Sequence, residues 1–211
     1  THCISSAASD VYKRQMQKTL QVIRKADPEF KVSLAGNFHK ELEADIYDYC
    51  IPIGASYPAE VLARRAQNNL PTTYYTCCTE AFPNTFTFSD PAEAAWMSYY
   101  SAKDHLDGYL RWAYNSWPKE PLLDSRFEAW AGGDTYLVYP GARSSIRFEK
   151  LIEGVQAHEK ITILRKEFTD KKNKTGFKKL EKMLSTFNLR DFPEVPAAET
   201  VNKANKILNS L

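Results

Sequence analysis

Short runs of β-branched and aromatic residues alternate with helical segments through the first half of this chain, and this alternation constrains the fold most strongly. β-Branched and aromatic runs favour extended strands, whereas apolar residues at helical spacing indicate helices. We predict strands at residues 31–35, 46–53, 72–78 and 108–112. We predict helices at residues 16–26, 57–69 and 91–105. This order predicts an α/β fold in which right-handed crossovers join parallel strands.

Two helix starts carry capping signals. Pro58 suits the first turn of the second helix, and Ser56 is expected to cap it. Asp90 is expected to cap the third helix, with Glu93 at the capping-box position three residues later.

Four parallel strands are half of an eight-stranded (β/α)8 TIM-like barrel, and an open doubly wound sheet would fit the same count. No glycine-rich nucleotide loop follows any of the predicted strands, which removes the best positive argument for a dinucleotide-binding fold. We therefore predict the C-terminal half of a TIM-like barrel, followed by C-terminal helices.

The second half of the chain begins with a long aromatic loop at residues 113–133. A fifth strand-like segment, 134–139, follows it and stops at Pro140. A helix is predicted from about Ser145 to residue 168, with its apolar face formed by Phe148, Leu151, Ile152 and Val155. Further helices are predicted at about residues 177–187 and 197–211, with a linker marked by Pro193 and Pro196.

The N-terminal residues are treated separately. Residues 1–15 resemble translated adapter sequence of the kind found at the ends of reading frames assembled from environmental DNA. They lack the basic start, apolar run and cleavage site of a signal peptide. We therefore expect a non-native segment at 1–15, a barrel half at 16–168 and a helical extension at 169–211, with the native protein extending further upstream.

Charge and composition exclude several classes of function. The net charge of +2 gives no reason to expect a nucleic-acid partner, and the basic bias between Arg165 and Lys182 is most simply a solvated helix face. No stretch approaches the roughly 20 apolar residues that a membrane span needs. The cysteines and histidines lack metal-ligand spacing, so we expect no metal and no cofactor, and we expect the thiols, including adjacent Cys77 and Cys78, to be buried.

Three ordered blocks carry a family resemblance. They are GYLRWAYNSW at residues 108–117, GDTYLVYPG at 133–141 and SSIRFEKLIEGV at 144–155. Their succession, with NNLPTTYYTCC and FSDPAEAAWMSYYSAKDHLDG upstream, resembles the domain of unknown function 4091, which forms the C-terminal part of glycoside hydrolase family 123 catalytic modules. The resemblance covers roughly residues 16–168.

The resemblance implies a retaining exo-β-N-acetylgalactosaminidase with a substrate-assisted mechanism, in which the acetamido oxygen of the sugar attacks the anomeric carbon. An adjacent Asp-Glu pair orients the acetamido group and supplies the general acid. No Asp-Glu dipeptide occurs in residues 16–211, so we assign no catalytic residue and expect a fragment that is inactive alone. The implied partner is a glycan containing N-acetylhexosamine, and the implied location is the periplasm or the cell surface.

Because barrel enzymes place their sites at the carboxyl ends of the strands, the candidate substrate-binding residues lie at or beyond those ends. They are Tyr75, Trp112, Tyr114, Asn115, Trp117 and Glu128. The aromatic rings would pack on the apolar face of a pyranose, and the polar groups would bind its hydroxyls. Each has a structural alternative: Trp117, for example, would serve as a loop anchor.

Three nearby residues are predicted to have structural roles. Asp134 is expected to be a turn residue, and Arg147 and Glu149 to form an ion pair or a cap contact.

Two interpretations of different classes remain open at this point. The first is a glycosidase fragment with half of a cleft. The second is a non-catalytic carbohydrate-binding or structural module, and an unrelated α/β enzyme is a weaker third. An upstream strand that ends in Asp-Glu would favour the first.

Overall fold

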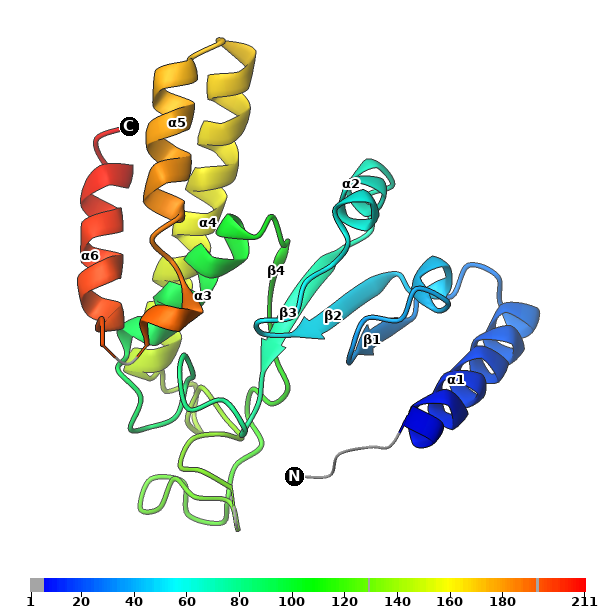
Figure 1. Ribbon diagram of the computed structural model, residues 1–211. Helices are drawn as coiled ribbons and strands as arrows, with labels where there is room; N and C mark the ends of the chain where they lie inside the picture. Colours follow the sequence, from blue (N-terminus) through cyan, green and yellow to red (C-terminus); the bar gives the residue numbers. More distant parts are fainter. Residues whose placement is uncertain (1–5, 129, 193) are drawn as a thin grey trace. The chain divides into compact units, whose positions relative to one another are not determined.

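The computed structural model of the chain describes residues 6–128, 130–192 and 194–211 (Figure 1). Its internal contacts group into two compact units, the first ending at Thr73 and the second running from Tyr74 to Leu211. No helix among the described residues is both long enough and apolar enough to cross a lipid bilayer.

The strands form one parallel sheet in which the spatial order follows the chain. Strands β1 (Ser33–Ala35), β2 (Asp48–Pro52), β3 (Thr72–Thr76) and β4 (Gly108–Arg111) lie in the order β1-β2-β3-β4. β1 and β2 pair with Leu34 opposite Tyr49. Helix α2 (Ala59–Gln67) connects β2 to β3, and α3 (Ala92–Lys103) connects β3 to β4. The predicted α/β class with parallel strands is confirmed, although each strand is shorter than its sequence pattern.

A buried arginine organises the first unit, which also contains α1 (Ser6–Ala26) and the short η1 helix (Glu43–Asp45). Arg65 of α2 is fully buried and forms an ion pair with Glu43 at 3.2 Å. Its guanidinium also donates to the carbonyls of Ile46 at 3.0 Å, Tyr47 at 2.7 Å and Pro71 at 2.8 Å. These bonds hold α2 against the segments that lead into β2 and β3, and they supply the partners that a buried charge requires.

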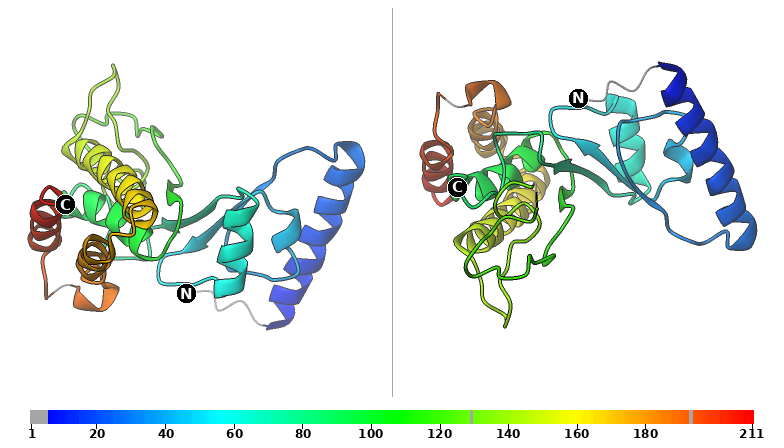
Figure 2. Two further views of the ribbon diagram at one scale, coloured as in Figure 1. Left: turned by 90° about the horizontal axis from the view of Figure 1, so that it is seen from above. Right: turned by 90° about the horizontal axis from the view of Figure 1, so that it is seen from below.

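The second unit is built around α3, which is buried along its length from Ala92 to Ala102. Helix α3 contacts β4 and three later helices, α4 (Ile146–Asp170), α5 (Lys174–Leu184) and α6 (Ala197–Leu208). Figure 2 shows these four helices side by side in both views. A short η2 helix (Leu189–Asp191) connects α5 to α6. Predicted residue Pro193 of the linker lies outside the described residues.

The helix starts agree with the sequence only in part. Helix α1 begins at Ser6 rather than at residue 16, because residues 6–15 contain no proline or glycine to interrupt it. The prediction that Ser56 caps α2 is wrong, since Pro58 occupies the cap position and no side chain accepts a hydrogen bond there. Helix α4 starts as predicted, because the Ser145 hydroxyl accepts from the backbone N–H of Phe148 at 3.2 Å.

The predicted fifth strand at residues 134–139 is absent. The segment makes only isolated antiparallel bridges, between Asn115 and Tyr136 and between Tyr139 and Arg143. Its backbone instead bonds to the aromatic loop, as when the Leu137 N–H donates to the carbonyl of Tyr114 at 2.8 Å. Residues 134–139 bury their apolar side chains among loops. They therefore have the sequence pattern of a strand, although no strand among the described residues pairs with them.

The predicted apolar face of α4 is correct only for Phe148 and Leu151, which are half-buried. Ile152 and Val155 are exposed by 37% and 52%. The buried face instead carries Arg147, Gly154, Ala157, Ile161, Leu164 and Phe168. Small residues at Gly154 and Ala157 let α4 approach α3 closely, and the sequence pattern, which weighs large apolar side chains, does not detect this.

We expect Gly154→Ala to destabilise the protein. A Cβ at this position would lie 2.6 Å from the Ser98 hydroxyl and 2.9 Å from the Ala95 Cα, so α3 and α4 must separate. Overpacking of this kind costs about 1–3 kcal/mol, which exceeds the gain of up to about 1 kcal/mol in helix propensity. Urea unfolding monitored by circular dichroism measures the difference. Gln156→Ala, on the exposed side of α4, is the control, and a more stable Gly154→Ala variant would contradict close packing.

Candidate functional site

The carboxyl ends of β3 and β4 open onto two irregular segments, residues 77–91 and 112–145. In parallel α/β structures, functional side chains gather at this end of the strands, because the loops that follow each strand meet there. The candidate site is therefore built from these two segments and from the last residues of the two strands.

An ion pair joins the strand ends to both loops. The guanidinium of Arg111, the last residue of β4, donates to the carboxylate of fully buried Asp134 and, at 2.6 Å, to its carbonyl oxygen. The other terminal nitrogen of Arg111 donates to the Thr76 carbonyl at 3.4 Å and to the Asn84 amide oxygen at 3.2 Å. Asp134 lies in a turn as predicted, with its N–H donating to the Ala131 carbonyl at 3.0 Å, and its carboxylate is in addition the counter-charge of Arg111.

Asn84 shapes the loop after β3. Its side-chain amide is fully buried and donates to the carbonyls of Cys77 at 2.8 Å and Glu80 at 2.7 Å. Its amide oxygen accepts from the Thr85 N–H at 2.8 Å as well as from Arg111. The carboxylate of Glu80 in turn accepts from the Cys77 N–H at 2.6 Å. Residues 77–85 are thus held by side chains rather than by regular backbone pairing.

An exposed pair of indole rings lies above this network. Trp112 directly follows β4, is exposed by 48%, and donates from its ring nitrogen to the Asp134 carboxylate at 3.4 Å. Its ring centroid lies 5.6 Å from that of Trp130, at an interplanar angle of 44°. Because Asp134 is fixed by Arg111, the orientation of Trp112 depends on the buried pair. Aromatic rings held in this way offer an apolar surface to a ligand.

Three other predicted residues follow Trp112 along the loop. Tyr114 turns its ring toward α4, with its centroid 5.7 Å from that of Phe148. Asn115 has an exposed side chain. Trp117 donates from its ring nitrogen to the Val138 carbonyl at 2.7 Å, which anchors the loop while leaving part of the ring exposed. Among these loop residues, Trp112 is the one whose hydrogen bond joins it to the Arg111 network.

The remaining two predicted residues lie apart in the sequence. Tyr75 lies in β3 and is half-buried. Glu128 is exposed and has a positive φ of 53°, a backbone conformation that residues other than glycine rarely adopt.

Sequence patterns did not place Arg111, Asn84, Asp134 or Trp130 in the site. One signal was available: successive side chains of a strand point to opposite faces, so an exposed Trp112 implies that Arg111 points inward. The partner of a buried Arg111 must then be acidic or a set of carbonyls. The sequence does not identify Asp134 as that partner, because the two residues lie far apart along the chain.

Arg147, at the start of α4, binds the backbone of both loops of the candidate site. It is buried and donates to the carbonyls of Thr85 and, at 2.9 Å, Gly133. Glu149 accepts instead from the Ser144 hydroxyl, so the predicted alternative of an Arg147–Glu149 ion pair is wrong. Burial lowers the pKa of the Arg147 guanidinium from its usual value, which is consistent with a charge satisfied mainly by backbone carbonyls.

The thiols follow the prediction only in part. Cys50 is buried as expected, but Cys77 is partly exposed and Cys78 is exposed. The reason is that β3 ends at Thr76, so the pair lies in the loop and not within the strand. In the described part of the chain, no three His, Cys, Asp or Glu side chains are grouped closely enough to hold a metal ion.

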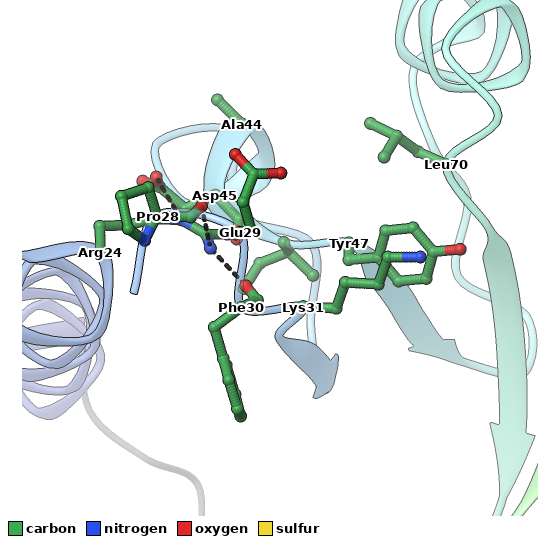
Figure 3. A pocket seen from close by; sticks show the side chains of 10 residues that line it. Arg24, Pro28, Glu29, Phe30, Lys31, Ala44, Asp45, Tyr47 and Leu70 are labelled. Carbon is green, nitrogen blue, oxygen red and sulfur yellow. Dashed lines mark hydrogen bonds and ion pairs between the residues drawn. The ribbon is translucent and has the colours of Figure 1, made fainter. Parts of the chain in front are cut away.

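A pocket of about 210 Å³ lies in the first unit, next to the end of α1 (Figure 3). Its lining residues precede strands: Phe30 and Lys31 lead into β1, Tyr47 into β2 and Leu70 into β3. Arg24 spans it and donates to the Pro28 carbonyl at 3.2 Å and the Asp45 carbonyl at 2.7 Å. A pocket at the amino ends of the strands, braced by such bonds, is typical of structural support rather than of a catalytic site.

Glu93 links the site to α3 through the predicted capping box. Its carboxylate is buried and accepts from the N–H groups of Asn84 at 2.7 Å and Asp90 at 3.1 Å. The Asp90 carboxylate accepts from the Ala92 N–H at 2.9 Å, so the predicted cap is confirmed. Burial raises the pKa of Glu93 to about 7, against the opposing effect of the two N–H donors.

A protein-family profile and a solved structure are similar to this chain. The profile "Glycoside hydrolase 123, catalytic domain" matches residues 3–164. A family 123 glycoside hydrolase from Clostridium perfringens, whose structure was used to study glycolipid glycan hydrolysis, is similar with a TM-score of 0.67 and 26% identity. The match covers 85% of this chain and 35% of that one, so this chain spans about a third of its length. No curated protein sequence matches the chain.

We expect Asp134→Ala to destabilise the protein by about 3–5 kcal/mol, because it leaves the Arg111 charge buried without its carboxylate. The free energy of unfolding in urea, followed by tryptophan fluorescence, measures this loss. Asp124→Ala is the matched control, since it removes an exposed ion pair with Arg126 at 2.7 Å and should leave stability unchanged. Equal losses in both variants would contradict a structural role for the Arg111–Asp134 pair.

We also expect Glu93 to make stability depend on pH. Its pKa of about 7 in the folded chain exceeds the usual 4.5, so the native state binds the proton more tightly than the unfolded chain. The free energy of unfolding therefore falls as pH rises from about 4.5 to about 7, by up to about 3 kcal/mol from this group.

Urea unfolding of the wild type and of Glu93→Gln across this pH range separates the contribution of Glu93 from those of all other groups. The difference between the two proteins should change steadily with pH. A difference that is constant with pH would show that Glu93 does not titrate in this range.

Proposed function

Because the chain belongs to the glycoside hydrolase 123 catalytic-domain family, we propose that it forms part of the sugar-binding cleft of a retaining exo-β-N-acetylgalactosaminidase. The observation that carries this proposal is the exposed Trp112–Trp130 pair at the carboxyl end of β4. Trp112 of this pair is oriented by its hydrogen bond to Asp134, which is in turn held by Arg111.

The proposed architecture is the C-terminal half of a TIM-like barrel. The parallel order β1-β2-β3-β4, with helices in the connections, supports it, as does the similarity to about a third of a larger family 123 enzyme. In this arrangement β1 and β4 are the edges of the sheet and would pair with strands from the rest of the barrel. Unpaired sheet edges are otherwise a liability, because they recruit other strands.

The proposed mode of sugar binding follows from the chemistry of a pyranose. One face of the ring presents C–H groups, which pack on aromatic side chains, whereas the hydroxyls require oriented polar partners. We assign the stacking surface to Trp112, with Trp130 beside it. The other proposed contacts are Tyr75, Tyr114, Asn115, Trp117 and Glu128. Trp117 combines this role with anchoring the loop through its bond to the Val138 carbonyl.

The catalytic carboxylates are proposed to lie outside this chain. Substrate-assisted hydrolysis needs one carboxylate to orient the acetamido group and a second to protonate the leaving oxygen. Residues 16–211 contain no adjacent Asp-Glu pair. Asp134 is fully buried and engaged by Arg111, so its carboxylate does not face a substrate. The chain would then supply binding and orientation while another segment supplies the proton.

The proposed substrates are glycans that contain N-acetylhexosamine. The relative from Clostridium perfringens, studied for glycolipid glycan hydrolysis, makes the glycans of glycolipids the first class to examine. A non-catalytic carbohydrate-binding module is the alternative that the experiment must separate from this proposal.

We expect the 211-residue chain to bind N-acetylgalactosamine without hydrolysing a chromogenic β-N-acetylgalactosaminide. Titration monitored by tryptophan fluorescence and calorimetry measures the affinity. Trp112→Ala should weaken it by roughly tenfold, equivalent to about 1.4 kcal/mol. Phe177→Ala, which removes a partly exposed ring from α5, is the control and should bind normally.

Extension of the gene upstream distinguishes a glycosidase from a non-catalytic carbohydrate-binding module. If the extended protein hydrolyses the substrate and loses activity when an upstream Asp-Glu pair is replaced, the glycosidase assignment holds. Sugar binding by an extended protein without such a pair indicates the binding module. Absence of sugar binding to either protein would overturn the assignment of the cleft.

A further inference from the structure

The turn between α4 and α5 forms a tightly held tip that the proposed glycosidase function leaves unexplained. Asn173 accepts from the Gly176 N–H at 2.9 Å and donates its own N–H to the Phe168 carbonyl at 2.7 Å. Lys172 adopts the left-handed conformation, with a φ of 54°. Figure 1 shows α4 and α5 running side by side to this turn. The side chains at the tip are therefore displayed from a fixed backbone.

An apolar cavity of about 390 Å³ opens at the tip. Its walls include the rings of Phe168, which is buried, and Phe177, which is 38% exposed. Gly176 lets the turn pack closely against the cavity wall, since a Cβ there would lie 3.0 Å from the Phe168 ring and would force a shift. The exposed Phe177 ring and the cavity together give the tip an apolar centre.

Lysines surround this apolar centre. Lys172, Lys174 and Lys178 line the cavity, and in the described part of the chain none of the three forms an ion pair. The nearby carboxylates are already engaged by other cations. These pairs are Asp170 with Lys166 at 2.7 Å, Glu167 with Lys171 at 2.6 Å and Glu181 with Arg165 at 2.7 Å. The tip therefore presents positive charge that its own helices do not neutralise.

We propose that this tip, defined by Phe168, Lys172, Lys174, Phe177 and Lys178, docks onto the surface of an anionic lipid bilayer. The ammonium groups would contact phosphate and carboxylate headgroups, and Phe177 would enter the boundary between headgroups and acyl chains. Basic residues around an apolar or aromatic centre are the combination that binds such surfaces. The inference is independent of the sugar cleft and of any hydrolysis.

A bilayer fits this surface better than an acidic peptide does. A bound peptide needs partners for its backbone N–H and C=O groups, as in strand addition or a helix groove. The cavity offers mainly apolar walls, and its lysines provide donors only. A lipid surface needs no backbone partners, and its acyl region matches the exposed ring.

The test uses the 211-residue chain and co-sedimentation with vesicles of phosphatidylcholine, with and without phosphatidylserine. We expect binding to the anionic vesicles only, weakened by added salt because the charges are exposed. The charge-reversal variant K172E/K174E/K178E should bind at least about 100-fold more weakly, since each lysine contributes roughly fivefold at such a surface.

Two controls separate local docking from general charge. K18E/K25E/K40E changes the net charge by the same amount at exposed lysines outside the tip and should bind normally. Phe177→Ala should weaken binding to vesicles, whereas Trp112→Ala should not. Absence of binding to anionic vesicles, or an equal loss in both triple variants, would overturn the proposal. Equally tight, tip-dependent binding to polyglutamate that is insensitive to Phe177→Ala would assign the tip to an acidic polypeptide instead.

Discussion

The buried ion pair between Arg111 and Asp134 is the contact on which the candidate site depends. It lies where β3 and β4 end. From the end of β4, the two terminal nitrogens of Arg111 reach the last residue of β3 and both long loops. A buried pair adds little net stability, because desolvation offsets most of its attraction. Its effect here is geometric. It sets the position of Asp134, and Asp134 sets the orientation of the exposed Trp112 ring.

Helix α3 couples this site to the helical part of the second unit. At its start, Glu93 holds the N–H groups of Asn84 and Asp90 and so fixes the loop after β3. Farther along, the carbonyl of Met97 accepts from the Tyr74 hydroxyl of β3 at 2.6 Å. Its other side packs against α4, closely enough that a glycine is needed there. A change in α3 would therefore be transmitted both to the strand ends and to the helices.

The fold was largely predictable because its elements are encoded locally. Apart from the earlier start of α1, the helices and the first four strands lie near their predicted positions, and the capping residue Asp90 was identified correctly. Contacts between distant segments were not predictable in the same way. Residues 134–139 have the composition of a strand, but whether such a run pairs depends on what lies beside it. The exposed thiol of Cys78 results from a strand that ends two residues early.

In the candidate site, too, the locally encoded feature was predictable and the contacts between distant segments were not. Trp112 was found from its place at a strand end, whereas the residues that hold it were not, because their partners lie in different loops. The buried face of α4 was missed for a related reason, since small residues such as Gly154 and Ala157 give no hydrophobic signal. Sequence patterns thus locate the surface of such a site more readily than the polar network beneath it.

Asn84 has a consequence for how this position tolerates change during evolution. Its amide uses both donors, to Cys77 and Glu80, and its oxygen serves both Thr85 and Arg111. Aspartate has the same size but lacks the two donors, leucine lacks every polar atom, and glutamine is longer by one methylene group. Among the genetically encoded residues none reproduces both the shape and the four bonds. Substitution at this position therefore requires compensating changes in the loop, so we expect it to vary far less than the exposed residues around it.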